Sequence, residues 1–378
     1  MPKRDEIPSR LVIAIGGNAT HPEGIRGTPT EQADVAAGVG RALLPLMELD
    51  TELIITHGNG PVVGKILMRQ SLARQRVEPM TLDICVAHSQ GGIAYLLMQA
   101  LENALRAVDN QRHVVCLLTQ VEVDPNDPAF KNPSKPIGYF YSEEEAKALS
   151  AELGWEMRED SGRGWRHVVP SPQPKHICDI SLIQVVAKSG AVVIAGGGGG
   201  VPVVRTGKRQ RHGVEAVIDK DRTSALMANV LHIDDLMILT AVPRVAINFG
   251  KPNQTSLERV TLSEIKKYHA EGHFPPGNGT RESHQPLGIA QLSMLDSHYN
   301  VHKNTVDFVA IILGPQLPGQ VRAQSHQDIF IQIQHPTGIR NFNSSHQIGE
   351  VEGQVRAGFG PGRGRKRPRS LARERIKG

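Results

Sequence analysis

Two short apolar runs, each ending in glycine and asparagine, restrict what this chain can fold into. The first reads VIAIGGNA over residues 12–19, and the second reads LIITHGNGP over residues 53–61. An unbroken apolar run predicts a parallel strand buried on both faces, and glycines at its end leave backbone N–H groups open to an anion. Residues 30–49 and 61–76 have helical patterns, so two helix N-termini add their dipoles. The pair predicts a binding site for a small, doubly anionic substrate.

Strand-like and helix-like segments alternate from about residue 11 to residue 240. This order predicts βαβ units, a mainly parallel sheet and a ligand site at the carboxyl ends of its strands. The expected strands are residues 11–15, 52–56, 113–119, 191–195, 214–218 and 236–240. Further helices are expected over residues 92–106 and 177–188, and from Asp221 onward. The fold class is therefore α/β.

Composition divides the chain into a body and a tail. We expect one domain over residues 1–277, with a lobe of short strands inserted at about residues 121–175, where Pro, Lys and Asp gather, lying over the site. Residues 278–378 are rich in Gln, His, Gly and Arg and predict a divergent tail, basic and disordered from about residue 350. One apolar run in the tail, residues 308–313, is an expected strand.

The net charge of +5 belongs to the tail. Residues 363–377 hold eight basic residues and one acidic residue, so the rest of the chain is slightly negative, and nucleic acid is not an expected partner of the body. Cys85, Cys116 and Cys178 are widely spaced, which argues against a disulfide framework and a structural zinc site. The sequence shows no apolar leader and no run long enough to span a membrane, so a cytoplasmic location is expected.

Three further motifs carry candidate chemistry. Residues 196–200 are five glycines after an expected strand, which favours a phosphate-binding backbone nest, with a flexible linker as the alternative. Lys220 stands between Asp219 and Asp221, where it can neutralise a phosphoryl group while the carboxylates orient lysines or a magnesium ion. The alternative there is a helix N-cap at Asp221. Lys135, between prolines, suits a stiff loop that closes over an anion; the alternative is a surface lysine.

A different class of enzyme is suggested by residues 84–91, which read ICVAHSQG. An apolar run, this motif and a following helix resemble the nucleophile elbow of α/β-hydrolases, with Ser89 as the nucleophile. The alternative is a helix N-cap at Ser89. His57, beside Gly58, is expected to be a loop residue rather than a base.

A long series of motifs occurs in a fixed order along the chain. They are A-I-G-G-N-A at 14–19, T-H-G-N-G-P at 56–61, P-M-T-L-D at 79–83, S-Q-G at 89–91, V-D-P-N-D-P-A-F at 123–130, G-R-G-W-R at 162–166, G-V-E-A-V-I-D-K-D at 213–221 and I-N-F-G-K-P-N-Q at 247–254. In these motifs the chain resembles the carbamate kinases of the amino-acid-kinase superfamily. The resemblance covers about residues 10–277 and gives Ser89 no role as a nucleophile.

This resemblance implies a three-layer αβα sandwich around a mostly parallel sheet of about eight strands, usually in a homodimer. It implies reversible phosphoryl transfer between ATP and carbamate, giving ADP and carbamoyl phosphate with Mg²⁺, in arginine breakdown. The protein need not supply a nucleophile, because positioning and charge neutralisation suffice for this chemistry.

The resemblance also assigns roles by position. Carbamate and the transferring phosphoryl group are assigned to Gly16, Gly17, Asn18, Gly58, Asn59 and Gly60. Lys135 reaches that group from the lobe and Lys220 neutralises it, while Asp219 and Asp221 orient the lysines. The nucleotide is bordered by Gly196, Gly197, Gly198 and Gly199 and by Asn248 and Lys251. No metal ligand is assigned to the protein.

The C-terminal part departs from the family pattern. Residues 272–277, G-H-F-P-P-G, match it, but the family's S-M-x-P-K motif, which supplies a phosphate-contacting lysine, does not follow. Losing such a contact costs about 3 kcal/mol, or about a hundredfold in rate. Three hypotheses follow. Lys303 and residues 308–313 replace the missing helix and strand; or a shifted reading frame produced the tail and the enzyme is impaired; or the protein binds carbamoyl phosphate without catalysis and uses its basic tail for a partner.

Overall fold

The computed structural model describes residues 8–273 except 23–24, 161, 208–209, 234, 240–245, 249–250 and 258, and leaves the side chains of residues 18–19, 259–260 and 262 undescribed. Backbone alone is described at residues 305–307, 331–332 and 341–342. The chain divides into two units, residues 1–343 and 344–378, and every helix and strand below belongs to the first. The strand expected over residues 308–313, the hypotheses on the tail and Lys303 lie outside the described residues.

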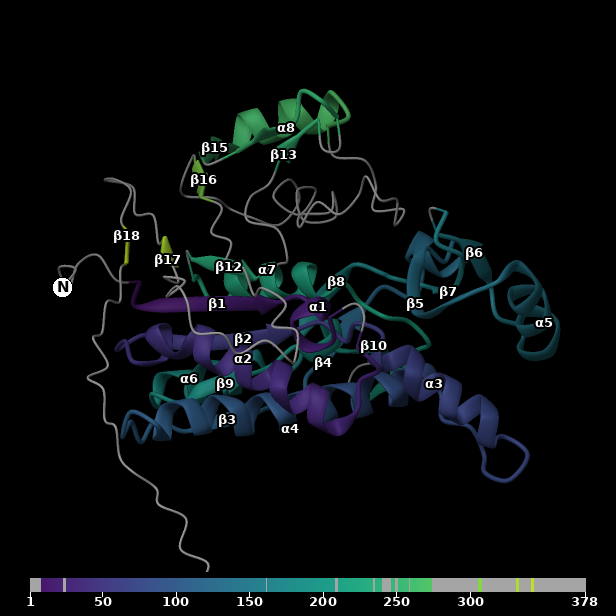
Figure 1. The fold of residues 1–378 in the computed structure, drawn as a ribbon, viewed down its shortest axis with the longest axis horizontal. Coiled ribbons are helices and arrows are strands. Elements are labelled where there is room, and N and C mark those ends of the chain that lie inside the picture. Colours follow the sequence, from purple (N-terminus) through teal and green to yellow (C-terminus); the bar gives the residue numbers. More distant parts are fainter. Residues whose placement is uncertain are drawn as a thin grey trace, which may run out of the picture. The chain divides into compact units, whose positions relative to one another are not determined.

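A parallel sheet forms the centre of the fold (Figure 1). Its described strands are β1 (Arg10–Ile15), β2 (Glu52–His57), β3 (Val114–Cys116), β9 (Val192–Ile194) and β12 (Leu236–Leu239), in the order β12-β1-β2-β9-β3. Every pairing is parallel. The predicted α/β class is therefore confirmed, whereas the described part of the sheet has five strands rather than about eight.

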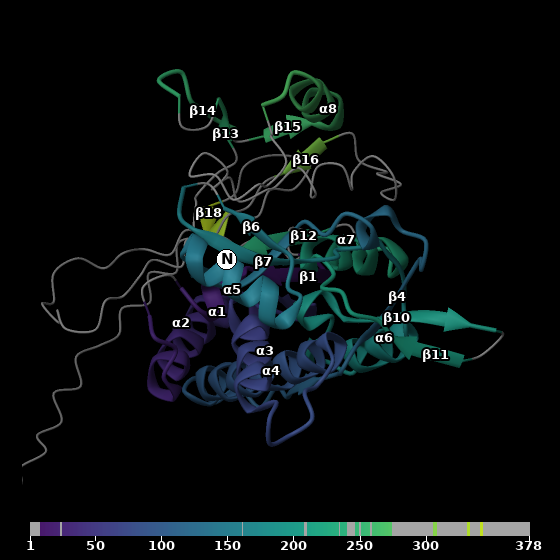
Figure 2. The same cartoon turned by 90° about the vertical axis from the view of Figure 1, so that its right-hand side faces the viewer.

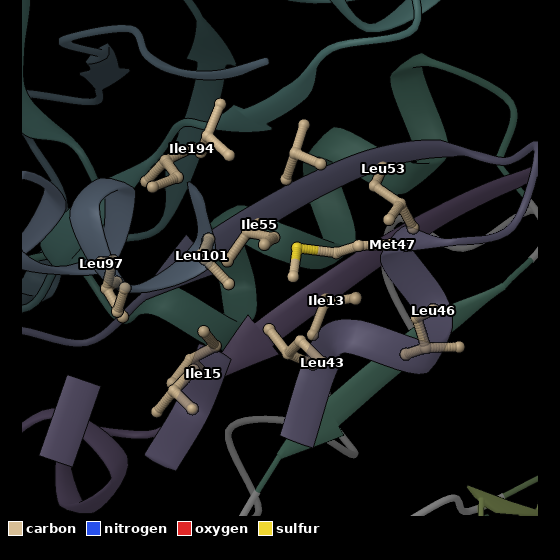
Figure 3. Close-up of a cluster of buried hydrophobic side chains, with 14 of the residues drawn as sticks. Ile13, Ile15, Leu43, Leu46, Met47, Leu53, Ile55, Leu97, Leu101 and Ile194 are labelled. Carbon is tan, nitrogen blue, oxygen red and sulfur yellow. The ribbon is translucent and has the colours of Figure 1, made fainter. Parts of the chain in front are cut away.

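Helices cover both faces of this sheet, as the predicted three layers require. On one face lie α2 (Pro29–Met47) and α4 (Leu82–Arg106), and on the other α6 (Ile180–Lys188) and α7 (Lys220–Val230). Side chains alternate between these faces along each strand. Ile13 and Ile15 of β1 pack with Leu43 of α2 and Leu97 of α4 (Figure 3), while Val12 packs in the opposite core. Burial on both faces explains why the strands read as unbroken apolar runs.

The prediction of a strand over residues 214–218 was wrong. These residues connect β11 (Gln210–Gly213) to α7 and belong to no sheet. The Val217 N–H donates to the Pro170 carbonyl at 2.9 Å. An apolar run predicts that the segment is buried, but not how. Here the burial comes from packing against neighbouring loops and helices rather than from pairing with strands of a sheet.

The helix expected to begin near residue 92 begins ten residues earlier, at Leu82 of α4. Ser89 therefore lies inside the helix, fully buried, and its hydroxyl donates to the Val86 carbonyl at 2.7 Å. A nucleophile elbow requires a strand that ends just before the serine, and an N-cap requires a helix that starts there. Both interpretations of Ser89 were wrong, because the apolar residues before it belong to the helix.

The fold also contains a second sheet and a lobe. The lobe lies between β3 and β9 in the sequence, whereas the second sheet takes two strands from before β9 and two from after it. The second sheet contains β4 (Gln120–Val123), β8 (Pro174–Ile177), β10 (Val201–Thr206) and β11, in the order β11-β10-β4-β8. The lobe contains β5 (Lys135–Tyr141), α5 (Glu143–Leu153), β6 (Met157–Glu159) and β7 (Trp165–Val169), with β7 paired to both other strands (Figure 2). Lys135 thus opens a strand rather than lying on a loop.

The remaining elements are short. They are α1 (Gly17–Thr20), α3 (Val62–Ala73), the 3₁₀ turns η2 (Pro128–Phe130) and η3 (Gly197–Gly199), β13 (Ala246–Ile247), β14 (Thr255–Ser256), β15 (Arg259–Thr261), α8 (Leu262–Ala270), β16 (Thr305–Asp307), β17 (Ile331–Gln332) and β18 (Asn341–Phe342). Within the described residues, no helix has the length and apolar character needed to cross a membrane.

Candidate active site

The two glycine-asparagine loops meet at one edge of the parallel sheet. Strands β1 and β2 pair in register up to Ile15 and His57, so the loops that follow them start side by side. A Cβ placed on Gly17 would lie only 2.8 Å from the Gly60 Cα, and one on Gly58 only 3.0 Å from the Gly17 nitrogen. Side chains larger than hydrogen would push the loops apart. Gly16 follows β1 directly, whereas the side chain of Asn18 lies outside the described residues.

A third loop, residues 196–200, packs against the second. It follows β9, the neighbour of β2, and turns sharply through positive φ angles, including 63° at Gly196 and 91° at Gly199. A Cβ on Gly198 would lie 2.8 Å from the Asn59 side-chain nitrogen. The Thr223 hydroxyl of α7 donates to the Gly199 carbonyl at 2.7 Å. The segment is buried and anchored, so the flexible-linker interpretation was wrong.

Four charged side chains gather at the start of α7. Asp219 caps this helix by accepting from the Asp221 N–H at 2.9 Å, and its other oxygen accepts from Lys135 Nζ of the lobe, also at 2.9 Å. Lys220 pairs with Asp221, and its side chain passes the second loop, since a Cβ on Gly58 would lie 3.4 Å from Lys220 Cδ. The N-cap interpretation holds for this helix, but the capping residue is Asp219 rather than Asp221.

The pKa of Asp219 reports this arrangement. Burial raises the pKa of the carboxyl group, but Lys135 and Lys220 lower it more strongly, so the net pKa lies well below its usual range. Asp219 is therefore ionised and can hold Lys135 in place. Lys135, Lys220, Asp219 and Asp221 come together with Gly58 of the second loop, which places two ammonium groups, each held by a carboxylate, beside glycine loops suited to phosphate.

His57 is a site residue that the sequence interpretation placed in a loop. It is the last residue of β2 and is fully buried. Its Nδ1 lies 3.1 Å from the Gly58 carbonyl, which can only accept, so the neutral ring carries its proton on Nδ1 and leaves Nε2 as an acceptor. A Cβ on Gly197 would lie 2.3 Å from Nε2. The sequence signal that could have pointed to His57 is its position directly after an apolar run and directly before a glycine.

Two buried polar atoms at this edge have no hydrogen-bond partner among the described residues: His57 Nε2 and Asn59 Nδ2. Both face the third loop. Buried polar groups without partners are rare in folded proteins and often mark sites that a ligand or water completes. Their position supports a binding site at the point where the second and third loops meet.

Acid is expected to weaken the fold through buried histidines. Burial is the largest cause that lowers the pKa of His57 to about 4, and it also lowers that of His167 to about 4; His167 stacks on Trp155. The unfolded chain takes up a proton near pH 6.5, where the folded protein does not, so the stability is complete above that pH and is lost as the pH falls toward 4. His57 alone is expected to cost about 2 kcal/mol at pH 5.

Urea unfolding at pH 7.5 and at pH 5 measures this loss. The variant His167→Phe keeps a ring stacked on Trp155 but cannot titrate, so its free energy of unfolding should fall less between the two pH values. An equal fall in wild type and variant would rule out the contribution of His167.

The two other residues predicted to border the nucleotide, Asn248 and Lys251, lie in another segment. Asn248, with φ of 53°, follows β13 and donates from its side chain to the Asn253 carbonyl at 3.4 Å. Lys251 is exposed, and its N–H donates to the Asn248 carbonyl at 3.0 Å. Both hydrogen bonds lie within the β13–β14 turn. Neither of them connects Asn248 or Lys251 to the three glycine loops.

Among the described residues, no group of three or more His, Cys, Asp or Glu side chains could hold a metal ion. The carboxylates nearest the loops are already engaged, because Asp219 bonds Lys135 and the start of α7, and Asp221 pairs with Lys220. A divalent ion at this site would therefore depend on ligand oxygens for most of its coordination, as Mg²⁺ commonly does with nucleotide phosphates.

Comparison with known proteins agrees with this geometry. The model of the amino acid kinase family matches residues 9–281. The carbamate kinase-like protein YahI of Escherichia coli is 45% identical over 289 residues, 76% of this chain and 90% of that protein, and the carbamate kinase of Pyrococcus horikoshii is 45% identical over 276 residues, 72% and 87%. The structure of carbamate kinase from Giardia lamblia bound to AMP-PNP superposes with a TM-score of 0.67 at 38% identity, covering 77% of this chain and 90% of that one.

Proposed function

Because the chain belongs to the amino acid kinase family and is a kinase of the carbamate kinase type, we propose that it transfers a phosphoryl group reversibly between ATP and carbamate, giving ADP and carbamoyl phosphate. The observation that carries the proposal is the meeting of two glycine-asparagine loops with Lys220 and Lys135 at one sheet edge. Two converging loops fit the two ends of carbamoyl phosphate, a neutral carbamoyl group that accepts and donates hydrogen bonds and an anionic phosphate.

Each part of the site has a task in this reaction. Carbamate and the transferring group are proposed to lie against the two loops, at Gly16, Gly17, Asn18, Gly58, Asn59 and Gly60. The N–H groups of Gly16 and Gly58 donate to the Leu239 and Ile15 carbonyls, so these two glycines serve by allowing close approach rather than as donors. Lys220 neutralises charge on that group from beside Gly58, and Asp221 holds Lys220. Lys135 approaches from the lobe, held by Asp219. The protein contributes positioning and charge, which is what phosphoryl transfer requires of it.

On the nucleotide side, the proposal assigns phosphate contacts to Gly196, Gly197, Gly198 and Gly199 and further contacts to Asn248 and Lys251. The nucleotide bound by the Giardia enzyme, AMP-PNP, supports a nucleotide here. Mg²⁺ is proposed to arrive with ATP or ADP and, when bound, to neutralise phosphate charge. The engaged state of Asp219 and Asp221 favours an ion held mainly by phosphate oxygens.

We also propose a homodimer that works in the cytoplasm in arginine breakdown. Support for the dimer comes from large apolar side chains that the single chain leaves exposed: Tyr95 of α4 is 60% exposed, and Leu182 and Val185 of α6 are 52% and 64% exposed. A second copy of the chain that covers such side chains would remove apolar surface from water. Sedimentation equilibrium tests this, and a monomer at micromolar concentration would contradict the dimer.

The test of the function is ATP formation from ADP, Mg²⁺ and carbamoyl phosphate, followed with a coupled luciferase reaction on the full chain. Formation of ATP above a reaction without protein is expected. A background rate together with measurable binding of carbamoyl phosphate would replace the enzyme by a binding protein. A rate about a hundredfold below that of the Pyrococcus horikoshii enzyme, measured in parallel, would support impairment by the missing C-terminal lysine.

A further inference from the structure

Lys65, one turn into α3, contacts two segments that lie far from it in the sequence. Its Nζ donates to His21 Nε2 at 2.8 Å and to the Arg26 carbonyl at 3.0 Å. It also lies 5.3 Å from the centre of the Tyr139 ring, over its face. His21 directly follows α1, and Tyr139 belongs to strand β5 of the lobe. One ammonium group therefore joins the segment after the first loop, the helix after the second loop and the lobe.

The donor pattern at Lys65 is specific. A lysine ammonium only donates, so His21 Nε2 must be an acceptor and the ring neutral. Burial, with Lys65 the next contributor, lowers the pKa of His21, while Glu31 opposes this, and the buried ring is 6% exposed. The segment is packed closely, because a Cβ on Gly27 would lie 2.9 Å from Lys65 Nζ. Through His21 and Arg26, Lys65 thus ties the end of α1 and residues 25–28 to the start of α3.

The neighbouring residue makes the joint with the lobe tight. A Cβ on Gly64 would lie 2.1 Å from the Gly138 Cα, so the backbones of α3 and β5 touch. Tyr139 is the next residue of β5, and Lys135 is the first residue of the same strand. The strand that delivers Lys135 to Asp219 therefore rests on the turn of α3 that carries Gly64 and Lys65.

We propose that Lys65 is a positioning residue that couples the lobe strand carrying Lys135 to both substrate loops. Through Tyr139 it holds β5 against α3, and through His21 and Arg26 it holds the segment after Gly17. The catalytic part of this inference rests on the proposed phosphoryl transfer, since Lys135 must stay over the loops to act. The coupling itself is a property of the fold and can be measured without substrate.

The main test compares Lys65→Met with Arg69→Met in the full chain. Methionine keeps the length of the stem and the helix propensity but removes the charge, and Arg69 is an exposed residue on the same helix. For Lys65→Met we expect kcat/KM for carbamoyl phosphate to fall about tenfold, and amide hydrogen exchange without substrate to quicken in both residues 21–28 and residues 135–141. Arg69→Met should change neither, and Lys65→Arg, which still donates and stacks, should restore most of both.

A second variant separates the two halves of the coupling. Tyr139→Leu removes only the lobe contact, so exchange should quicken in residues 135–141 and stay unchanged in residues 21–28. In the double variant with Lys65→Met the loss in kcat/KM should equal that of Lys65→Met alone, because the same contact is removed.

Several outcomes would overturn the coupling. Unchanged exchange in Lys65→Met, or faster exchange confined to residues 21–28, shows that Lys65 does not hold the lobe. If wild type makes no ATP, the proposed function fails, while the exchange measurements still decide the coupling. If Lys65→Met does not fold, Tyr139→Leu and Lys65→Arg carry the test.

Discussion

Lys220→Ala is expected to lower the rate of ATP formation by about a thousandfold, the largest loss of activity from a single substitution in this chain. Lys220 is the cation beside the second loop, where its stem passes Gly58, and it is held by Asp221. Charge that develops on a transferring phosphoryl group is stabilised most by a cation already in place, because no reorganisation is needed during the reaction.

The same substitution removes one ion-pair partner of a buried carboxylate, since Asp221 is only 8% exposed. Breaking a buried ion pair by removing one of its members destabilises a protein by about 3 kcal/mol. The rate must therefore be measured with circular dichroism and thermal unfolding on the same samples. The double variant Lys220→Met with Asp221→Asn removes both charges and should recover stability while remaining inactive.

Lys188→Ala, at an exposed position near the end of α6, is the matched control and should keep full activity. A Lys220→Ala protein that is folded and turns over at a rate within threefold of wild type would show that Lys220 does not contact the reacting group.

Gly199→Ala is expected to cause the largest loss of stability, more than about 3 kcal/mol, and to abolish nucleotide binding at the third loop. The φ angle of Gly199 is 91°, and a Cβ there would lie 2.2 Å from the Ile218 carbonyl oxygen. Ile218 lies directly before Asp219 and Lys220, so relief of the clash has to move either the third loop or the start of α7.

Gly207→Ala separates the clash from the backbone strain. Gly207 also has a positive φ, 62°, but a Cβ there meets nothing within 4 Å. The free energy of unfolding of this variant should fall only by the cost of placing alanine in the left-handed region, about 1 to 2 kcal/mol. Urea unfolding and isothermal titration with ADP measure the two variants. Equal stabilities would mean that the contact with Ile218 relaxes at no cost.

Much of the fold was predictable because its signals are local. The apolar runs that became β1 and β2 and the helix after each were predicted nearly to the residue. The errors have a common cause. Residues 216–218 and residues 85–86 are apolar and buried like strand residues, but the first group lies in a connection outside the sheets and the second in a helix. Burial by itself does not determine which backbone hydrogen bonds form.

The candidate site was predictable in its parts. The structure brings together the two loops, Lys135 and the Asp-Lys-Asp motif, which the sequence had predicted as parts of one site. The position of His57 beside them was not predicted, because a histidine at the end of an apolar run shows its burial only once the neighbouring strand is known. Lys65 carries no signal in the sequence, since each of its contacts comes from another segment.

The sequence by itself determined the α/β class and the kinase family, because these depend on residue types at short spacings. Only the tertiary structure decided how the parts meet. The order β12-β1-β2-β9-β3 places the third loop beside the second, although β3 and the whole lobe separate them along the chain. It also brings Lys135 to Asp219 across 84 residues. Strand order depends on long-range packing of the two cores, and no local pattern of residues records it.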